Sequence, residues 1–188
     1  SAIRDNNPVV FVEHRMLHFR KGHVPEEAYT VPFGKARVLA PGDDVTLVGI
    51  SYMAVECMRA RKYLADVGLS AEVIDPVSLS PLDAETIAAS VRKTGRLLVA
   101  DNGWLACGAS AEIITRVMEC LGGKCEFRAQ RLGFEPVTCP PTKILEDLFY
   151  PSPEKIAAVA HDMIRDKAGH WMPAAAAKPE IIEFKGPF

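Results

Sequence analysis

Long apolar runs, paired cysteine motifs and an excess of charge of one sign are all missing from this sequence of 188 residues. No apolar run approaches the roughly 18 residues that cross a bilayer, so we expect no membrane partner. Lys and Arg together number 22 against 24 Asp and Glu. This net charge of −2 gives no electrostatic reason to expect nucleic acid as a partner.

The cysteines are odd in number and form no CxxC pair, which argues against a disulfide framework and against a zinc site. We expect reduced thiols in a cytosol-like compartment, most of them acting as small core residues. Cys107, just before a predicted helix start, is the one candidate for a reactive thiol. No charged-then-apolar leader is visible, and the chain begins with Ser1 rather than Met, so we expect it to be processed or part of something longer.

From Asp44 onward, the sequence alternates regularly between short apolar runs and amphipathic segments. Strands are predicted at 45–50, 71–75, 97–100 and 125–132, and helices at 54–67, 83–95, 109–121 and 152–165. A single helical turn is expected around 144–148. This order predicts an α/β fold: a three-layer, doubly wound, mostly parallel sheet with helices on both faces. Before it, 8–12 has strand character, 35–39 alternates like an edge strand, and 181–184 near the end resembles a strand or docking segment.

The stretch DNGWLACG at 101–108 lies where such folds bind ligands, between a strand and a helix. It does not match G-x-G-x-x-G, and Ala109 and Ser110 stand where a phosphate-binding loop needs Lys and Ser or Thr. Two interpretations stay open. The turn binds a nucleotide, or its small residues let helix and strand pack closely while Trp104 covers a neighbouring surface.

Glu13 and His14 are a candidate pair for acid–base chemistry, and the nearby His18 and His23 are candidate metal ligands. A metal pair of His14 and His18 would need a helix, which this polar segment does not predict. A hydrogen-bonded or solvated loop is the alternative. The residues themselves display no constellation that assigns catalysis.

Several stretches follow one another in an order and spacing that are specific as a set. They are IRDNNPVVFVEH at 3–14, VPEEAYTVPFGKA at 24–36, GDDVTLV at 42–48, AEVID at 71–75, LSPLD at 79–83, KTGRL at 93–97 and KILED at 143–147. Taken together, they resemble one family: the β subunits of the thiamine-diphosphate-dependent 2-oxo acid dehydrogenases of the pyruvate, branched-chain and acetoin types. The resemblance covers about residues 2–166.

The resemblance implies a transketolase C-terminal-like domain at 44–166, preceded by a linker and edge strand at 15–43. Residues 1–14 would be the last helix and strand of an upstream pyrimidine-binding domain. The tail at 167–188 is longer than the resemblance leads us to expect, and we expect it to dock on a partner chain. In the family, the upstream domain supplies the glutamate that activates thiamine, and the α subunit holds the diphosphate and Mg²⁺. Neither region occurs here, so the resemblance implies no catalytic, cofactor-binding or metal-binding residue on this chain.

The implied role is that of an assembly domain in an enzyme whose isolated chain is inactive. The implied partners are the α subunit, a second β subunit and the lipoyl acyltransferase core, in the cytoplasm or the mitochondrial matrix. The turn at 101–108 would then shape a subunit contact through Asn102, Gly103, Trp104 and Gly108. Two alternatives remain. One is the C-terminal domain of a deoxyxylulose-phosphate synthase or transketolase, against which the linker at 24–36 argues. The other is a free-standing module with a small-molecule site at Ser51 and Asn102.

Overall fold

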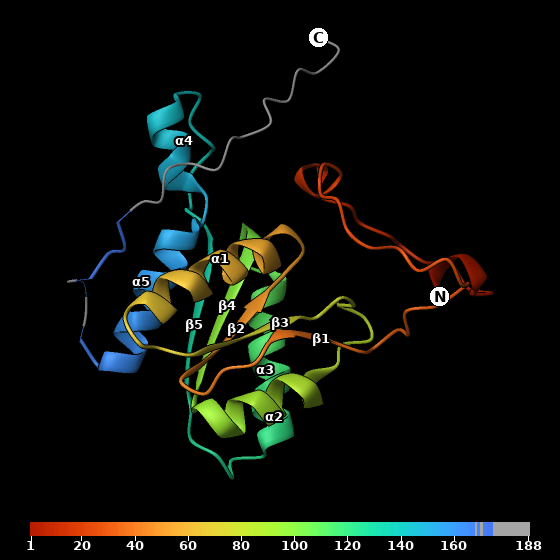
Figure 1. The fold of residues 1–188 in the computed structure, drawn as a ribbon, viewed down its shortest axis with the longest axis horizontal. Helices are drawn as coiled ribbons and strands as arrows, with labels where there is room; N and C mark the ends of the chain where they lie inside the picture. The colour runs from red at the N-terminus through yellow and green to blue at the C-terminus, as the bar shows by residue number, and fades with distance from the viewer. Residues whose placement is uncertain (168, 170, 175–188) are drawn as a thin grey trace.

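The structure is a computed structural model that describes residues 1–167, 169 and 171–174. At its centre is a five-stranded sheet in the order β1-β3-β2-β4-β5 (Figure 1). The edge strand β1 runs antiparallel to β3, and the other neighbours are parallel. This confirms the predicted mostly parallel sheet and its edge strand. The strands are β1 Arg37–Ala40, β2 Val45–Gly49, β3 Ala71–Asp75, β4 Arg96–Trp104 and β5 Arg128–Phe134.

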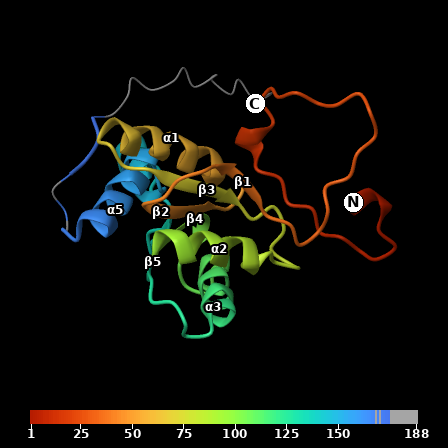
Figure 2. The same ribbon diagram turned by 60° about the horizontal axis from the view of Figure 1, so that its bottom comes forward.

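Helices cover both faces of the sheet, with α1 and α5 on one side and α2 and α3 on the other (Figure 2). The chain moves from β2 to β3 in one direction and then returns across the sheet to β4 and β5. The strand order therefore reverses between β2 and β4, as in a doubly wound fold. The helices are α1 Tyr52–Asp66, α2 Ala84–Thr94, α3 Ala109–Leu121, α4 Lys143–Phe149 and α5 Pro153–Arg165. No helix within the described residues is long and apolar enough to cross a membrane.

Local signals set the helix ends. The Asp83 side chain accepts a hydrogen bond from the Thr86 backbone N–H at the start of α2, and Gly95 ends that helix in the left-handed conformation. Ser152 caps α5 in the same way through the Lys155 N–H, with Pro153 in its first turn.

Alternating side chains of the central strands separate two apolar cores. Leu47 and Leu98 belong to the core under α1 and α5, whereas Val48 and Val99 belong to the core over α2 and α3. All four side chains are fully buried. The sheet is thus covered on both faces, which explains its continuous apolar strands.

Two predicted segments differ from the structure. The strand predicted at 8–12 is wrong: this stretch is irregular, and Val10 and Val12 are 89% and 83% exposed. Strand propensity alone does not form a strand where no neighbouring strand accepts its hydrogen bonds. The turn predicted to begin at Asp101 begins later in the structure. Strand β4 continues to Trp104, which pairs with Phe134 of β5. The segment predicted at 181–184 lies outside the described residues.

Candidate functional site

The reversal of strand order brings the ends of β2 and β4 together at the carboxyl edge of the sheet. Gly49 ends β2, and a Cβ there would lie only 2.4 Å from the Ala54 backbone nitrogen, so glycine lets α1 begin directly against the strand. Ser51, between strand and helix, has a positive φ of 57°. On the adjacent strand β4, the Asn102 side chain extends from this edge of the sheet and contacts the His14 ring.

The turn between β4 and α3 is built for close packing. A Cβ on Gly108, the N-cap residue of α3, would lie 2.1 Å from the Trp104 carbonyl oxygen. The Asp101 carboxylate lies 3.8 Å from that same Cβ position and 3.2 Å from a Cβ built on Gly103. The Asp101 carboxylate therefore lies beside both glycines, close to the start of α3. The geometry favours the packing interpretation of the two glycines over the nucleotide interpretation.

Burial raises the pKa of the Asp101 carboxyl group, and its hydrogen bond with the Asn102 backbone opposes this effect. A half-buried carboxylate this close to the start of α3 would repel a bound phosphate for as long as it is ionised.

His14 joins the N-terminal part of the chain to this edge. Its Nε2 atom lies 3.1 Å from the Asn102 side-chain amide, and its ring stacks on Tyr52 of α1, with centroids 4.9 Å apart and planes 12° apart. Its Nδ1 atom accepts a hydrogen bond from the Met16 backbone N–H. Burial lowers the pKa of His14. These contacts support the interpretation of the segment as a hydrogen-bonded loop.

His18 does not join His14 as a metal pair, because its Nε2 atom lies 3.1 Å from a Glu13 carboxylate oxygen in an exposed ion pair. The intervening residues form a short 3-10 turn, Arg15–Leu17, rather than the α-helix that a pair at this spacing needs. Across the described part of the chain, no three His, Cys, Asp or Glu side chains come together as metal ligands.

A buried carboxyl group lies on α1, close to Tyr52. Glu56 is 5% exposed and pairs with Arg59 at 2.8 Å, and its carboxyl group also hydrogen-bonds with Tyr52. Burial raises the pKa of Glu56, while the charges of Arg59 and Arg20 lower it. Arg20 belongs to the N-terminal part of the chain, so this region contributes a charge as well as a ring to the surface of α1.

Two cysteines lie close to these elements, Cys57 on α1 and Cys107 before α3. Cys57, next to Glu56, is fully buried, and burial raises its pKa, so the thiolate is disfavoured. Cys107 is exposed in the turn before α3, with a positive φ of 56°.

Trp104 belongs to an aromatic cluster that the sequence did not indicate. It is 49% exposed and packs edge-on against Phe134 and Phe149, with centroids 5.0 and 5.7 Å away. Phe149 is the last residue of α4, and this helix also exposes several apolar side chains. This α4 face comprises Ile144, Leu145 and Leu148, which are 80%, 50% and 66% exposed. The sequence KILEDLF could have indicated this apolar face, because its Ile144, Leu145 and Leu148 are spaced to lie on one side of a helix.

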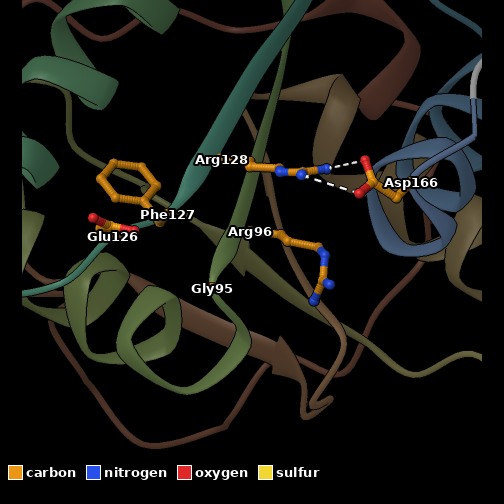
Figure 3. A pocket seen from close by; sticks show the side chains of 6 residues that line it. All are labelled: Gly95, Arg96, Glu126, Phe127, Arg128 and Asp166. Atoms are coloured by element: carbon orange, nitrogen blue, oxygen red, sulfur yellow. Dashed lines mark hydrogen bonds and ion pairs between the residues drawn. The ribbon is translucent and has the colours of Figure 1, made fainter.

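A cavity of about 390 Å³ opens at the opposite edge of the sheet, where β4 and β5 begin (Figure 3). Its two arginines are engaged by protein groups. Arg96 donates hydrogen bonds to the carbonyl oxygens of Met163, Asp44 and Thr94. Arg128 pairs with Asp166 at 2.5 Å. These arginines fasten the end of α5 to the sheet, and we assign the cavity no ligand.

The structure brings the four predicted contact residues to one edge. Asn102, Gly103 and Trp104 form the end of β4, and Gly108 begins α3. Their surroundings differ: Asn102 meets His14, the two glycines accommodate close packing, and Trp104 is open to solvent on one side.

Comparison with known proteins gives this arrangement a family context. Residues 34–156 match the model of the family described as transketolase, C-terminal domain. The β subunit of acetoin:2,6-dichlorophenolindophenol oxidoreductase from Cupriavidus necator is 40% identical over 170 residues, covering 87% of this chain and 48% of that protein. The pyruvate dehydrogenase E1 component β subunit of Porphyra purpurea is 35% identical over 164 residues, covering 87% of this chain and 50% of that protein.

The chain therefore spans about half the length of the curated relatives it matches. The names of these relatives describe enzyme subunits or components. Some come from bacteria, and others are named as mitochondrial proteins. A solved structure described as a split gene transketolase, inactive beta4 tetramer, superposes with a TM-score of 0.63 at 25% identity. That superposition covers 73% of this chain and 44% of the other.

Proposed function

Because this chain belongs to the transketolase C-terminal domain family, we propose that it is the assembly domain of a β subunit in a 2-oxo acid dehydrogenase complex. The component concerned is the thiamine-diphosphate-dependent one that decarboxylates the 2-oxo acid and passes the acyl group to lipoyl. One observation carries the proposal: nearly the whole chain is similar to β subunits of acetoin and pyruvate enzymes. The domain occupies 44–166, after a linker at 15–43.

The described residues fit neither thiamine diphosphate nor its magnesium ion. The Asp101 carboxylate lies close to the start of α3, where it would repel a diphosphate, and no metal-ligand cluster occurs among the described residues. In the complete enzyme, both groups would lie on the α subunit and on an upstream domain. This chain would supply contacts to the α subunit, to a second β subunit and to the lipoyl acyltransferase core, in the cytoplasm or the mitochondrial matrix.

Two apolar surfaces support an assembly role. The α4 face lies next to the half-exposed Trp104, and aromatic and aliphatic groups of this kind are typical of the central part of protein interfaces. The exposed stretch 8–12 has strand propensity, which fits the last strand of an upstream sheet, as proposed for 1–14. We propose that Asn102, Gly103, Trp104 and Gly108 shape the subunit contact on this edge.

A transketolase-type enzyme is the second candidate, favoured by the superposition on a split gene transketolase. The linker VPEEAYTVPFGKA at 24–36 argues for the dehydrogenase type. The two candidates differ in substrate. Activity on phosphosugars without an acyltransferase partner would support the transketolase type, and decarboxylation of a 2-oxo acid with acyl transfer to lipoyl would support the dehydrogenase type.

Reconstitution tests the proposal. The 188-residue chain is combined with an upstream β domain and an α subunit from the acetoin enzyme, together with thiamine diphosphate and Mg²⁺, and 2-oxo acid decarboxylation is measured. We expect activity only when all parts are present. Leu148→Glu on the α4 face should abolish assembly and activity. The matched control Met118→Glu, on the exposed side of α3, should leave both unchanged. A chain that neither assembles nor restores activity contradicts the proposal.

A further inference from the structure

We propose that His14 is a pH-sensitive switch that holds the N-terminal segment, residues 1–33, against the carboxyl edge of the sheet at neutral pH and releases it on acidification. This inference concerns the chain itself and goes beyond the assembly role. It rests on the contacts of His14 with two elements, α1 and β4, that lie far from it in sequence.

The N-terminal segment buries little of its own apolar surface. Val10 and Val12 point into solvent, and no residue of 1–33 is buried. Hydrophobic burial therefore contributes little to holding this segment in place. Specific polar and stacking contacts carry correspondingly more of its attachment, and His14 makes both kinds.

The hydrogen bonds of His14 define its protonation state. Since Nδ1 accepts from the Met16 N–H, a neutral ring must carry its proton on Nε2. That N–H faces the Asn102 side-chain amide at 3.1 Å and needs an oxygen as its acceptor. The Asn102 Oδ1 atom is a buried oxygen with no other partner, and a half-turn of the amide places it opposite Nε2. Neutral His14 then satisfies the Met16 N–H, the Asn102 side-chain oxygen and both of its own nitrogens.

Protonation breaks this arrangement. The imidazolium carries an N–H on Nδ1, which would point at the Met16 N–H, and two donors cannot form a hydrogen bond. The 3-10 turn Arg15–Leu17 would lose its N-cap. Burial of the ring between the segment and Tyr52 also disfavours the charge, and it lowers the pKa of His14 from its ordinary value of 6.5.

The direction of the pH effect follows from this lowered pKa. The released segment binds the proton more readily than the docked segment. Docking is therefore fully favourable above pH 6.5, the ordinary value for histidine, and weakens as the pH falls below it toward the pKa of the docked ring.

Other charged groups surround His14, and the test must separate their effects. Glu56 is the important one, because its attraction to Arg20 also holds the segment and because burial raises its pKa. Protonation of Glu56 would weaken docking in the same direction, but independently of the residue at position 14. Tyr52 of α1 stacks on His14, and Glu56, Arg59 and Arg20 act electrostatically on Tyr52. On β4, Asp101 precedes Asn102, the partner of His14. On the segment itself, Glu13 and Arg15 flank His14 in the chain, and His18 pairs with Glu13.

Nuclear magnetic resonance on the full chain tests the switch between about pH 8 and about pH 5.5, the range in which histidine titrates. The His14 ring resonance reports its pKa, and the backbone ¹⁵N relaxation of residues 9–13 reports whether the segment is held. We expect these residues to lose order with a midpoint equal to the His14 pKa, below 6.5.

His14→Gln is the decisive variant, because glutamine can hydrogen-bond to Asn102 but does not titrate. It should remove the transition. His18→Gln is the matched control, because it replaces a histidine of the same segment that contacts Glu13 rather than Asn102 or Tyr52, and it should leave the transition unchanged. Asn102→Ala should loosen the segment severalfold at every pH. The proposal is overturned if His14→Gln keeps the transition, if His18→Gln removes it, or if the wild-type segment keeps the same order throughout.

Discussion

Replacing Gly108 by alanine tests directly whether the turn before α3 needs glycine for packing. The added Cβ would lie 2.1 Å from the Trp104 carbonyl oxygen, far closer than non-bonded atoms approach. The backbone of Gly108, with φ −80° and ψ 155°, is one that alanine adopts without strain. The loss of stability therefore comes from displacing the backbone, because the atom that must move is the carbonyl oxygen of Trp104 in β4.

The expected magnitude combines three effects. Overpacking of a close contact costs typically about 1–3 kcal/mol. Alanine is also a poorer N-cap than glycine, by up to about 1 kcal/mol. The lower backbone entropy of unfolded alanine returns about 0.4–1 kcal/mol. We expect Gly108→Ala to reduce the free energy of unfolding by about 1–3 kcal/mol.

Urea unfolding followed by far-ultraviolet circular dichroism measures this difference. Gly22→Ala is the control, because a Cβ there meets nothing within 4 Å, and its effect should stay within about 0.5 kcal/mol. If both variants unfold at the same urea concentration with the same slope, the close-packing explanation of Gly108 is refuted. Loss of nucleotide binding in Gly108→Ala at unchanged stability would instead support the phosphate interpretation.

Two further predictions concern charged groups. Arg96→Met removes three hydrogen bonds to backbone carbonyl oxygens, one of them on Met163 of α5, and should lower the free energy of unfolding by about 2–4 kcal/mol. Arg128→Met breaks an exposed pair with Asp166 and should cost under about 1 kcal/mol. Equal losses in urea unfolding would contradict this difference. Burial by itself raises the pKa of Glu72, but its hydrogen bonds, chiefly from Lys93, lower it overall. Its stabilising contribution is therefore present above the ordinary value of 4.5 and is lost as the pH falls through the lowered pKa. Lys93→Met should reduce or reverse the acid-induced fall of the melting temperature, and parallel pH profiles for the two proteins would show the reasoning to be wrong.

The sequence predicted most of the regular elements, because their signals are local. The helix predicted at 109–121 coincides with α3, and the strand predicted at 71–75 coincides with β3. Asp83 and Gly95 mark the ends of α2 through backbone geometry that a few adjacent residues determine. The alternation of strands and helices then restricted the fold to a doubly wound sheet.

The errors occurred where a partner distant in sequence decides the structure. The stretch 8–12 has the composition of a strand but lies beside no strand of the described chain. Conversely, Asp101 to Trp104 has turn-like composition, yet β4 continues there because β5 runs alongside it. Strand formation depends on the neighbour that completes the hydrogen bonds, and composition does not report the neighbour.

The same distinction applies to the site. The sequence alone predicts a turn with small residues and Trp104 after the third apolar strand, at an edge where such folds bind ligands. The fold of the whole chain places the Asp101 carboxylate beside Gly103 and Gly108, and His14 beside Asn102, 88 residues away. The physical reason is that helix caps and strand periodicity depend on neighbouring residues, whereas contacts between distant side chains depend on the order and spacing of packed strands. That order is a property of the whole folded chain.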